Sequence, residues 1–209
     1  MKNHYLLLSI PLVAGILALV GCGYIFHLIF ALSCTALVLL FPHEELKPYI
    51  WLIALAFVLS IGGDWMLKFK DTIPIRFVYG IALYFLAHVS YFIFFLKNGK
   101  FHIPTFTVLL AVYGFFYIMK LIPAIPDNLL LVAVLFYLVI SCCTFSAAIG
   151  LNLKNKISKY FFIAGIASLV FSDTLIALKE FLQTNTLYGW MMPTFYCSYM
   201  FATIAAMRK

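Results

Sequence analysis

Two aspartates, Asp64 and Asp173, lie inside long apolar runs of this sequence, whereas the other acidic residues lie in or beside polar breaks. An ionisable side chain in hydrocarbon costs roughly 2.5–3.5 kcal/mol even on a lenient scale, and such residues mark functional sites. A small residue, Gly63 or Ser172, precedes each aspartate and allows a helix or ligand to approach closely. We therefore predict a functional role for both carboxylates, against the alternative that each makes only a helix-packing hydrogen bond.

Two carboxylates at one depth can divide acid–base work, one holding a proton while the other remains an anion. Such a pair suits protonation of a substrate followed by attack of water on an oxocarbenium-like centre. It also suits a proton-coupled transporter, and a third alternative is a lipid-binding or scaffold protein without turnover. A transporter should have Gly or Pro breaks at corresponding positions of two repeats. Gly62 and Gly63 fit this pattern, but Phe171 and Ser172 do not, which disfavours a transporter.

A second group of polar residues follows one face of the helix predicted over 74–96. Tyr84, His88 and Tyr91 are spaced by four and then three residues, so their side chains share a helical face. In a membrane helix such a face contacts protein or a water-filled cavity. We expect His88 to lie about 15 Å deeper than Asp64, which argues against direct contact between them. In the last apolar run, Tyr196 is the residue we expect to line the site as a hydrogen-bond donor.

Metal and cofactor chemistry has no support in the sequence. The remaining histidines are scattered, and the five cysteines show no ligand spacing and are expected to be small packing residues. Gly-rich phosphate loops, Ser-His-Asp elements and zinc signatures are absent. We therefore predict a site without a metal or cofactor.

The composition is that of a polytopic membrane protein. Of the 209 residues, 66% are hydrophobic and 10% are charged, and the mean hydropathy is +1.09, whereas a soluble domain is roughly 45–50% apolar. A bilayer crossing takes roughly 20 apolar residues. The formal charge of +7 comes from Lys and Arg in the breaks between apolar runs, as at membrane surfaces, so nucleic-acid binding is not expected.

The apolar runs predict an all-α bundle of about eight transmembrane helices, in one domain over residues 1–209. The predicted helices are approximately 5–20, 22–41, 47–67, 74–96, 103–122, 128–150, 157–178 and 187–206. The third and seventh then run in the same direction, which places both aspartates in the same half of the membrane near the headgroup boundary. Similar depth is what a shared site requires.

The basic residues predict that both termini face the cytoplasm. The terminal side collects Lys2, Lys47, Lys97, Lys100, Lys154, Lys156, Lys159, Arg208 and Lys209. The other side collects Lys68, Lys70, Arg76, Lys120 and Lys179. Under the positive-inside rule the richer side is cytoplasmic. A bacterial inner membrane is the expected location, and the sequence leaves the oligomeric state open.

The sequence resembles the YhhN-like membrane proteins, which include lysoplasmalogenases. The shared elements are Lys47-Pro48 entering a helix, Gly-Asp-x-x-Leu over Gly63 to Leu67, His-x-x-Tyr over His88 to Tyr91, and Ser172-Asp173. Their order, their spacing and the eight-helix length fit the family over essentially the whole chain. The last helix departs from the family's Tyr-Tyr-x-x-Gln stretch, because this chain has Phe195-Tyr196-Cys197-Ser198-Tyr199 there.

The resemblance implies hydrolysis of the vinyl-ether bond of a lysoplasmalogen, which gives a fatty aldehyde and a glycerophospho-ethanolamine or -choline. Asp64 and Asp173 would be catalytic, and the family's motifs together with the polar face suggest a set of substrate-binding residues: Lys47, Tyr84, His88, Tyr91, Ser172 and Tyr196. With no soluble domain predicted, the expected partners are membrane lipids. We expect a lysolipid to enter sideways from the bilayer, with its chain in an apolar groove and its headgroup near the basic and aromatic rim.

Overall fold

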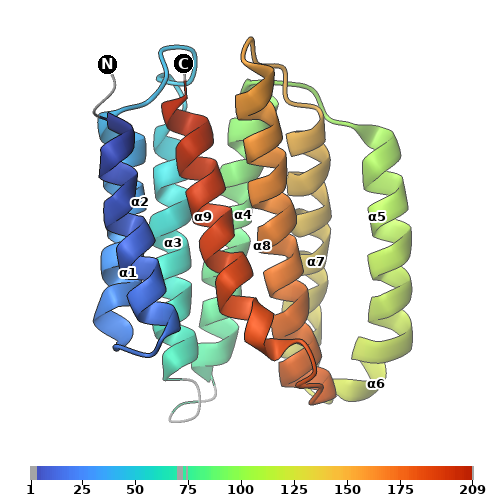
Figure 1. The fold of residues 1–209 in the computed structure, drawn as a ribbon. Coiled ribbons are helices and arrows are strands. Elements are labelled where there is room, and N and C mark those ends of the chain that lie inside the picture. The colour runs from blue at the N-terminus through green and yellow to red at the C-terminus, as the bar shows by residue number, and fades with distance from the viewer. Residues whose placement is uncertain (1–3, 70–72, 74, 209) are drawn as a thin grey trace.

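The computed structural model describes residues 4–69, 73 and 75–208, and these form a bundle of long helices joined by short loops (Figure 1). The predicted runs correspond closely to its elements. In chain order they are η1 (His4–Leu8), α1 (Ser9–Leu19), α2 (Tyr24–Leu40), α3 (Trp51–Lys68), α4 (Ile75–Lys97), α5 (Ile103–Phe116), η2 (Tyr117–Leu121), α6 (Ile122–Ala124), α7 (Asn128–Ile149), α8 (Lys156–Leu182), η3 (Tyr188–Trp190) and α9 (Met191–Met207).

The predicted helix over 103–122 is interrupted near its end. The α5 segment passes into the π-helical turn η2 and then into the single turn α6, which contains Pro123. Proline has no N–H to donate to the carbonyl four residues earlier, Met119, so the regular hydrogen-bond ladder is broken here. The α5 segment also has no buried residue, and it lies at the outside of the bundle (Figure 1).

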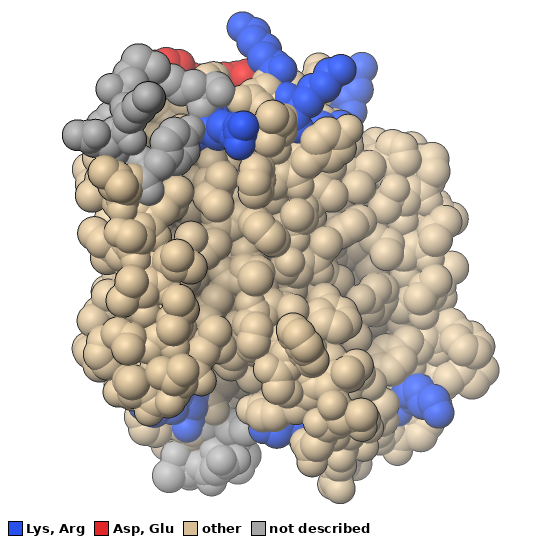
Figure 2. Space-filling model, in the orientation of Figure 1, with Lys and Arg blue, Asp and Glu red and all other residues tan. Residues whose placement is uncertain are grey.

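The outer surface is apolar, as expected of a helical membrane protein. By length and composition, the five segments Trp51–Lys68, Ile75–Lys97, Ile103–Ala124, Asn128–Ile149 and Lys156–Leu182 qualify as membrane spans among the described residues, and Leu6–Leu19 and Tyr24–Leu40 are shorter apolar helices. Figure 2 shows a broad band without charged side chains, with Lys and Arg gathered above and below it. The band has the pattern that lipid tails and headgroups favour.

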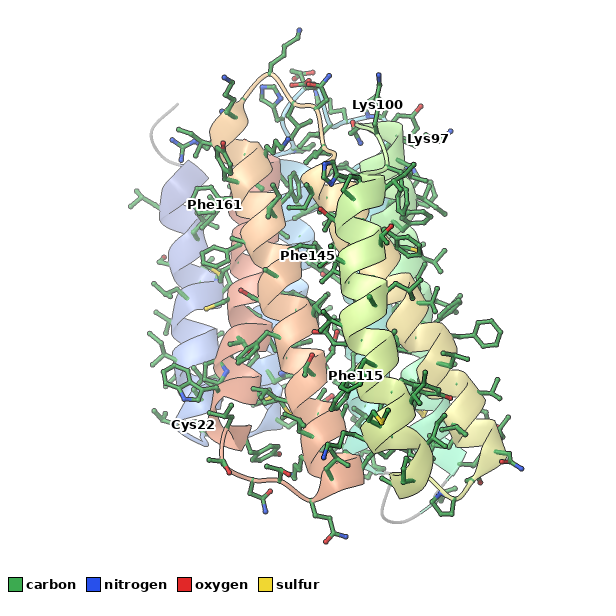
Figure 3. All side chains as sticks on the ribbon, turned by 90° about the vertical axis from the view of Figure 1, so that its right-hand side faces the viewer. Cys22, Lys97, Lys100, Phe115, Phe145 and Phe161 are labelled. Carbon is green, nitrogen blue, oxygen red and sulfur yellow. The ribbon has the colours of Figure 1, made fainter. Side chains whose placement is uncertain are left out.

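The helices alternate in direction, so α1 begins and α9 ends at the same end of the bundle, here called the termini end (Figure 1). Figure 3 shows Lys97 and Lys100 at the termini end and Cys22 at the opposite, distal end. Of the basic residues in the predicted charge distribution, Lys2, Lys70 and Lys209 lie outside the described residues. Both α3 and α8 run from the termini end towards the distal end, as the sequence predicts.

The centre of the bundle is formed by α4, which packs against α3 on one side and α7 on the other. The α2 helix packs against α1, α3 and α9, and α8 packs against α7 and α9. These contacts bring helices that are distant in sequence, such as α2 and α9, side by side. Two loops also meet at the termini end, where the Lys100 N–H donates to the Gly150 carbonyl at 3.0 Å.

Candidate active site

Asp64 is held by side chains from two neighbouring helices. His27, from α2, places Nε2 2.8 Å from Oδ2 of Asp64, and the Tyr84 hydroxyl, from α4, donates to Oδ1. Gly63, just before the aspartate, makes this possible, because a Cβ there would lie 3.0 Å from the Tyr84 ring. Gly63, the small residue predicted to permit close approach, therefore makes room for the Tyr84 ring, whose hydroxyl binds Asp64.

The network continues from His27 to Tyr196 on α9. The Nδ1 atom of His27 lies 2.9 Å from the Tyr196 hydroxyl oxygen. A neutral imidazole has one N–H and one acceptor nitrogen, so an Nε2–H donating to Asp64 leaves Nδ1 to accept from Tyr196. In that tautomer both ring nitrogens of His27 have a partner, and the Asp64 side chain accepts two hydrogen bonds.

Asp173 has a histidine of its own. His88, from α4, places Nε2 3.2 Å from Oδ2 of Asp173, and the His88 side chain is almost fully buried. The other ring nitrogen of His88 is buried without a hydrogen-bond partner among the described residues. The Tyr137 ring meets the imidazole edge-on, with centroids 5.2 Å apart. No group of three or more metal-ligating side chains occurs in the described part of the chain.

A cavity of about 490 Å³ contains Asp64 and opens at the distal end. Its walls come from the α1–α2 loop and from α2, α3, α4, α8 and α9. The lining residues used below are Tyr24, His27, Asp64, Lys68, Tyr84, Ser172, Lys179, Glu180, Tyr188 and Tyr196. The labelled Cys22 in Figure 3 marks the loop at this end, between the lining residues Gly21 and Gly23.

Asp173 lines two smaller, mostly apolar cavities of about 60 Å³ each. One of them shares Leu67, Tyr84 and Ile176 with the large cavity, and it shares Tyr137 and Asp173 with the other. The two carboxylates thus do not face one common space, although their similar depth had suggested that they would. The physical reason is the Tyr84 side chain. Its hydroxyl is hydrogen-bonded to Asp64, and its ring forms part of the wall between the two spaces.

The remaining predicted site residues separate into two groups. Ser172 lines the large cavity and donates from its hydroxyl to the Met191 carbonyl at 3.0 Å. Tyr91 is buried in the core, where its ring packs against Phe57 and Phe95 and contributes to none of these cavities. Lys47 pairs with Glu44 on the surface before α3, so it is at the termini end, away from Asp64. The structure therefore does not bring Tyr91 and Lys47 to the aspartates.

Sequence reasoning missed His27 and Tyr24 as site residues. Their spacing of three residues puts them on one face of α2, which was an available signal. The two rings are stacked, with centroids 5.3 Å apart. A histidine within an apolar run is ambiguous, however, until the helix packed against it is known. Here that helix is α3, and the partner is Asp64.

Together, the apolar bundle and its two histidine–carboxylate pairs, in which the histidines are buried and the aspartates partly buried, define an integral membrane protein with a polar site between its helices. The chain matches the YhhN family over residues 10–206, and it belongs to this family. It is also similar to a protein of Dictyostelium discoideum described as a lysoplasmalogenase homolog, with 27% identity over 172 residues, covering 69% of this chain and 55% of the relative. The chain thus spans about half the length of this curated relative. No solved structure matches it significantly.

Proposed function

We propose that this protein is a membrane-embedded hydrolase that cleaves the vinyl-ether bond of a lysoplasmalogen, releasing a fatty aldehyde and a glycerophospho-ethanolamine or -choline. The observation that carries the proposal is the Asp64 carboxylate, which accepts from Tyr84 and lies 2.8 Å from His27 Nε2 in a 490 Å³ cavity at the distal end. Asp173 lies behind the Tyr84 ring, so the two-aspartate reaction proposed here requires this ring to move aside and join the two spaces when a substrate binds. Family membership and the described relative support the same reaction class.

The first chemical step is proton transfer to carbon. Asp173, beside His88, gives its proton to the vinyl carbon remote from the ether oxygen, and the C=C electron pair forms the new C–H bond. The product is an oxocarbenium ion, with positive charge shared between the ether oxygen and its attached carbon. The Asp64 anion stabilises this charge, because a carboxylate already fixed by hydrogen bonds needs little reorganisation.

The second step is addition of water to the cationic carbon. Asp64 takes one proton from water as the C–O bond forms, which gives a hemiacetal. Collapse of the hemiacetal breaks the bond to the glycerol oxygen, which receives the proton held by Asp64. The hemiacetal O–H forms the aldehyde carbonyl and returns its proton to Asp173. Both aspartates are then restored, with no net gain or loss of protons.

The cavities suggest how a lysolipid is placed for this reaction. We propose that the headgroup and glycerol occupy the large cavity, with the vinyl ether near Tyr84, the first part of the hydrocarbon chain in the small cavities beside Asp173, and the rest of the chain in the bilayer. One of these is lined by Leu109, Tyr113 and Phe116 of the outermost helix α5. Lateral entry beneath α5 agrees with this placement. We further propose cytoplasmic termini in a bacterial inner membrane, on the charge distribution.

A proton-coupled transporter is less well supported. Such proteins commonly bind their substrate at breaks in discontinuous helices. Here α3 is continuous through Gly62, Gly63 and Asp64, and α8 is continuous through Ser172 and Asp173. The aspartates therefore lie on regular helices, which suits a fixed site better than an unwound one.

The test is release of aldehyde by the purified protein in detergent. The protein should convert a long-chain lysoplasmalogen to aldehyde over time, while the corresponding saturated ether lipid should remain intact, since it has no carbon that can accept the proton. Absence of aldehyde from a preparation that melts cooperatively would contradict the proposed reaction.

A further inference from the structure

The distal mouth of the large cavity carries two lysines that rest on aromatic rings. Lys68, the last residue of α3, places Nζ 3.9 Å from the ring centroid of Tyr24. Lys179, on α8, places Nζ 3.5 Å from the ring centroid of Tyr188. All four residues line the cavity. Among the described residues, neither lysine forms an ion pair with a carboxylate, so both ammonium groups keep N–H donors for a ligand.

The Tyr24 hydroxyl is a second, independent observation that points to a ligand at the mouth. Its hydroxyl is buried and has no hydrogen-bond partner among the described residues. A buried hydroxyl without a partner costs roughly 1–3 kcal/mol, and a ligand that supplies an acceptor would remove this cost. Because Lys68 lies over the same ring, one anion at the mouth can approach both groups.

The charge of the mouth favours an anion of low charge. Glu180 also lines the cavity, and Asp64 lies deeper in it, so the two lysines balance two carboxylates over the whole cavity, whereas at the mouth itself they accompany one, Glu180. Lys68 lies four residues beyond Asp64 on α3, which is about 6 Å along the helix. This is comparable to the glycerol unit that separates the phosphate of a lysolipid from its first ether oxygen. The lysines also lie at the end of the apolar band, at headgroup level.

We infer that Lys68 and Lys179, with the Tyr24 hydroxyl, form a binding subsite for the phosphodiester of a lipid headgroup. The inference deepens the proposed function and rests on it for the identity of the lipid that is turned over. The subsite fixes the lipid at its phosphate, so that the bond next to the glycerol lies level with Asp64. These residues are specificity determinants, because they distinguish phospholipids from neutral ether lipids.

The experiment measures binding without turnover. A saturated alkyl-lysophospholipid is titrated into the detergent-solubilised protein, and the fluorescence of its three tryptophans is followed, of which Trp65 and Trp190 lie towards the distal end. Lys68→Gln and Lys179→Gln should each raise the Kd about tenfold or more, while an alkylglycerol without phosphate should bind all variants equally. Lys120→Gln is the matched control, since Lys120 is near the same end on η2 but does not line the cavity.

Three results would overturn the inference. The first is unchanged lysophospholipid binding by both lysine variants, and the second is an equal loss of alkylglycerol binding, which would indicate a packing role. The third is binding of inorganic phosphate as tightly as the lipid in competition, which would indicate a site for the free anion. The binding measurement does not require hydrolysis, so its result stands even if the aldehyde assay fails. Conversely, unchanged binding would refute the phosphate subsite without contradicting the proposed reaction, which the aldehyde assay tests separately.

Discussion

Tyr84 and His88 lie one turn apart on the same face of α4, and each contacts one of the two aspartates, Tyr84 with Asp64 and His88 with Asp173. Four residues of helix span about 6 Å along the axis, so the aspartates are offset in depth by about one turn. The spacing of Tyr84 and His88 along α4 therefore sets the axial distance between the two carboxylates. This relationship explains why the two aspartates have different surroundings although both lie on helices of the same direction.

Replacing either aspartate by asparagine should remove most turnover while the fold is kept. Asn retains the volume and much of the hydrogen bonding but cannot exchange a proton, and loss of an acid or base typically lowers the rate about 10²–10⁴-fold. Aldehyde release by Asp64→Asn and Asp173→Asn measures the effect, and thermal melting in detergent is the control. Near-normal activity in either variant would assign that aspartate to packing.

His27 should affect the rate through Asp64 rather than through the fold alone. His27→Phe keeps an aromatic ring beside Tyr24 and Phe195 but removes both nitrogens, and we expect kcat to fall by about 10²-fold or more. His27→Gln keeps a donor that can reach the carboxylate, so its kcat should lie between those of the wild type and His27→Phe. Equal rates for the two variants at similar melting temperatures would argue against a positioning role.

The value of kcat/KM should rise with the length of the hydrocarbon chain, because each added buried CH₂ contributes up to about 0.8 kcal/mol of binding free energy until the groove is filled. Ala177 lines both small cavities beside Asp173, so Ala177→Phe should lower kcat/KM for long chains more than for short ones. Ala82→Phe, at an exposed position of α4, is the control. Short, fully soluble vinyl ethers that react as efficiently as long-chain lysolipids would refute this placement.

Gly150 should be required for the contact between two loops at the termini end. A Cβ at this position would lie 1.6 Å from the Lys100 carbonyl oxygen, so Gly150→Ala must displace backbone. We expect a loss of about 1–3 kcal/mol, seen as a lower melting temperature. Gly114→Ala is the matched control, because a Cβ there meets no atom within 4 Å and alanine favours a helix. Equal melting of both variants would contradict the prediction.

The sequence by itself determined the class of the protein and most of its helices. Apolar runs of about 20 residues are a local property, and each is long enough to be read without knowledge of its neighbours. The cost of a carboxylate in an apolar run is also local, so Asp64 and Asp173 were identifiable from their own surroundings. The spacing of Tyr84 and His88 likewise placed them on one face of a helix.

The tertiary structure decided which partner each of these residues has. His27 is 37 residues from Asp64 and Tyr196 is 169 residues from His27, and no local periodicity relates residues across such distances. Their contact depends on α2 packing between α3 and α9, which is a matter of how side chains of separate helices fit together. The same packing leaves Tyr91 in the core, although the helical face had grouped it with the site. Lys47 lies before α3 at the termini end, the side on which the predicted charge distribution had already placed it.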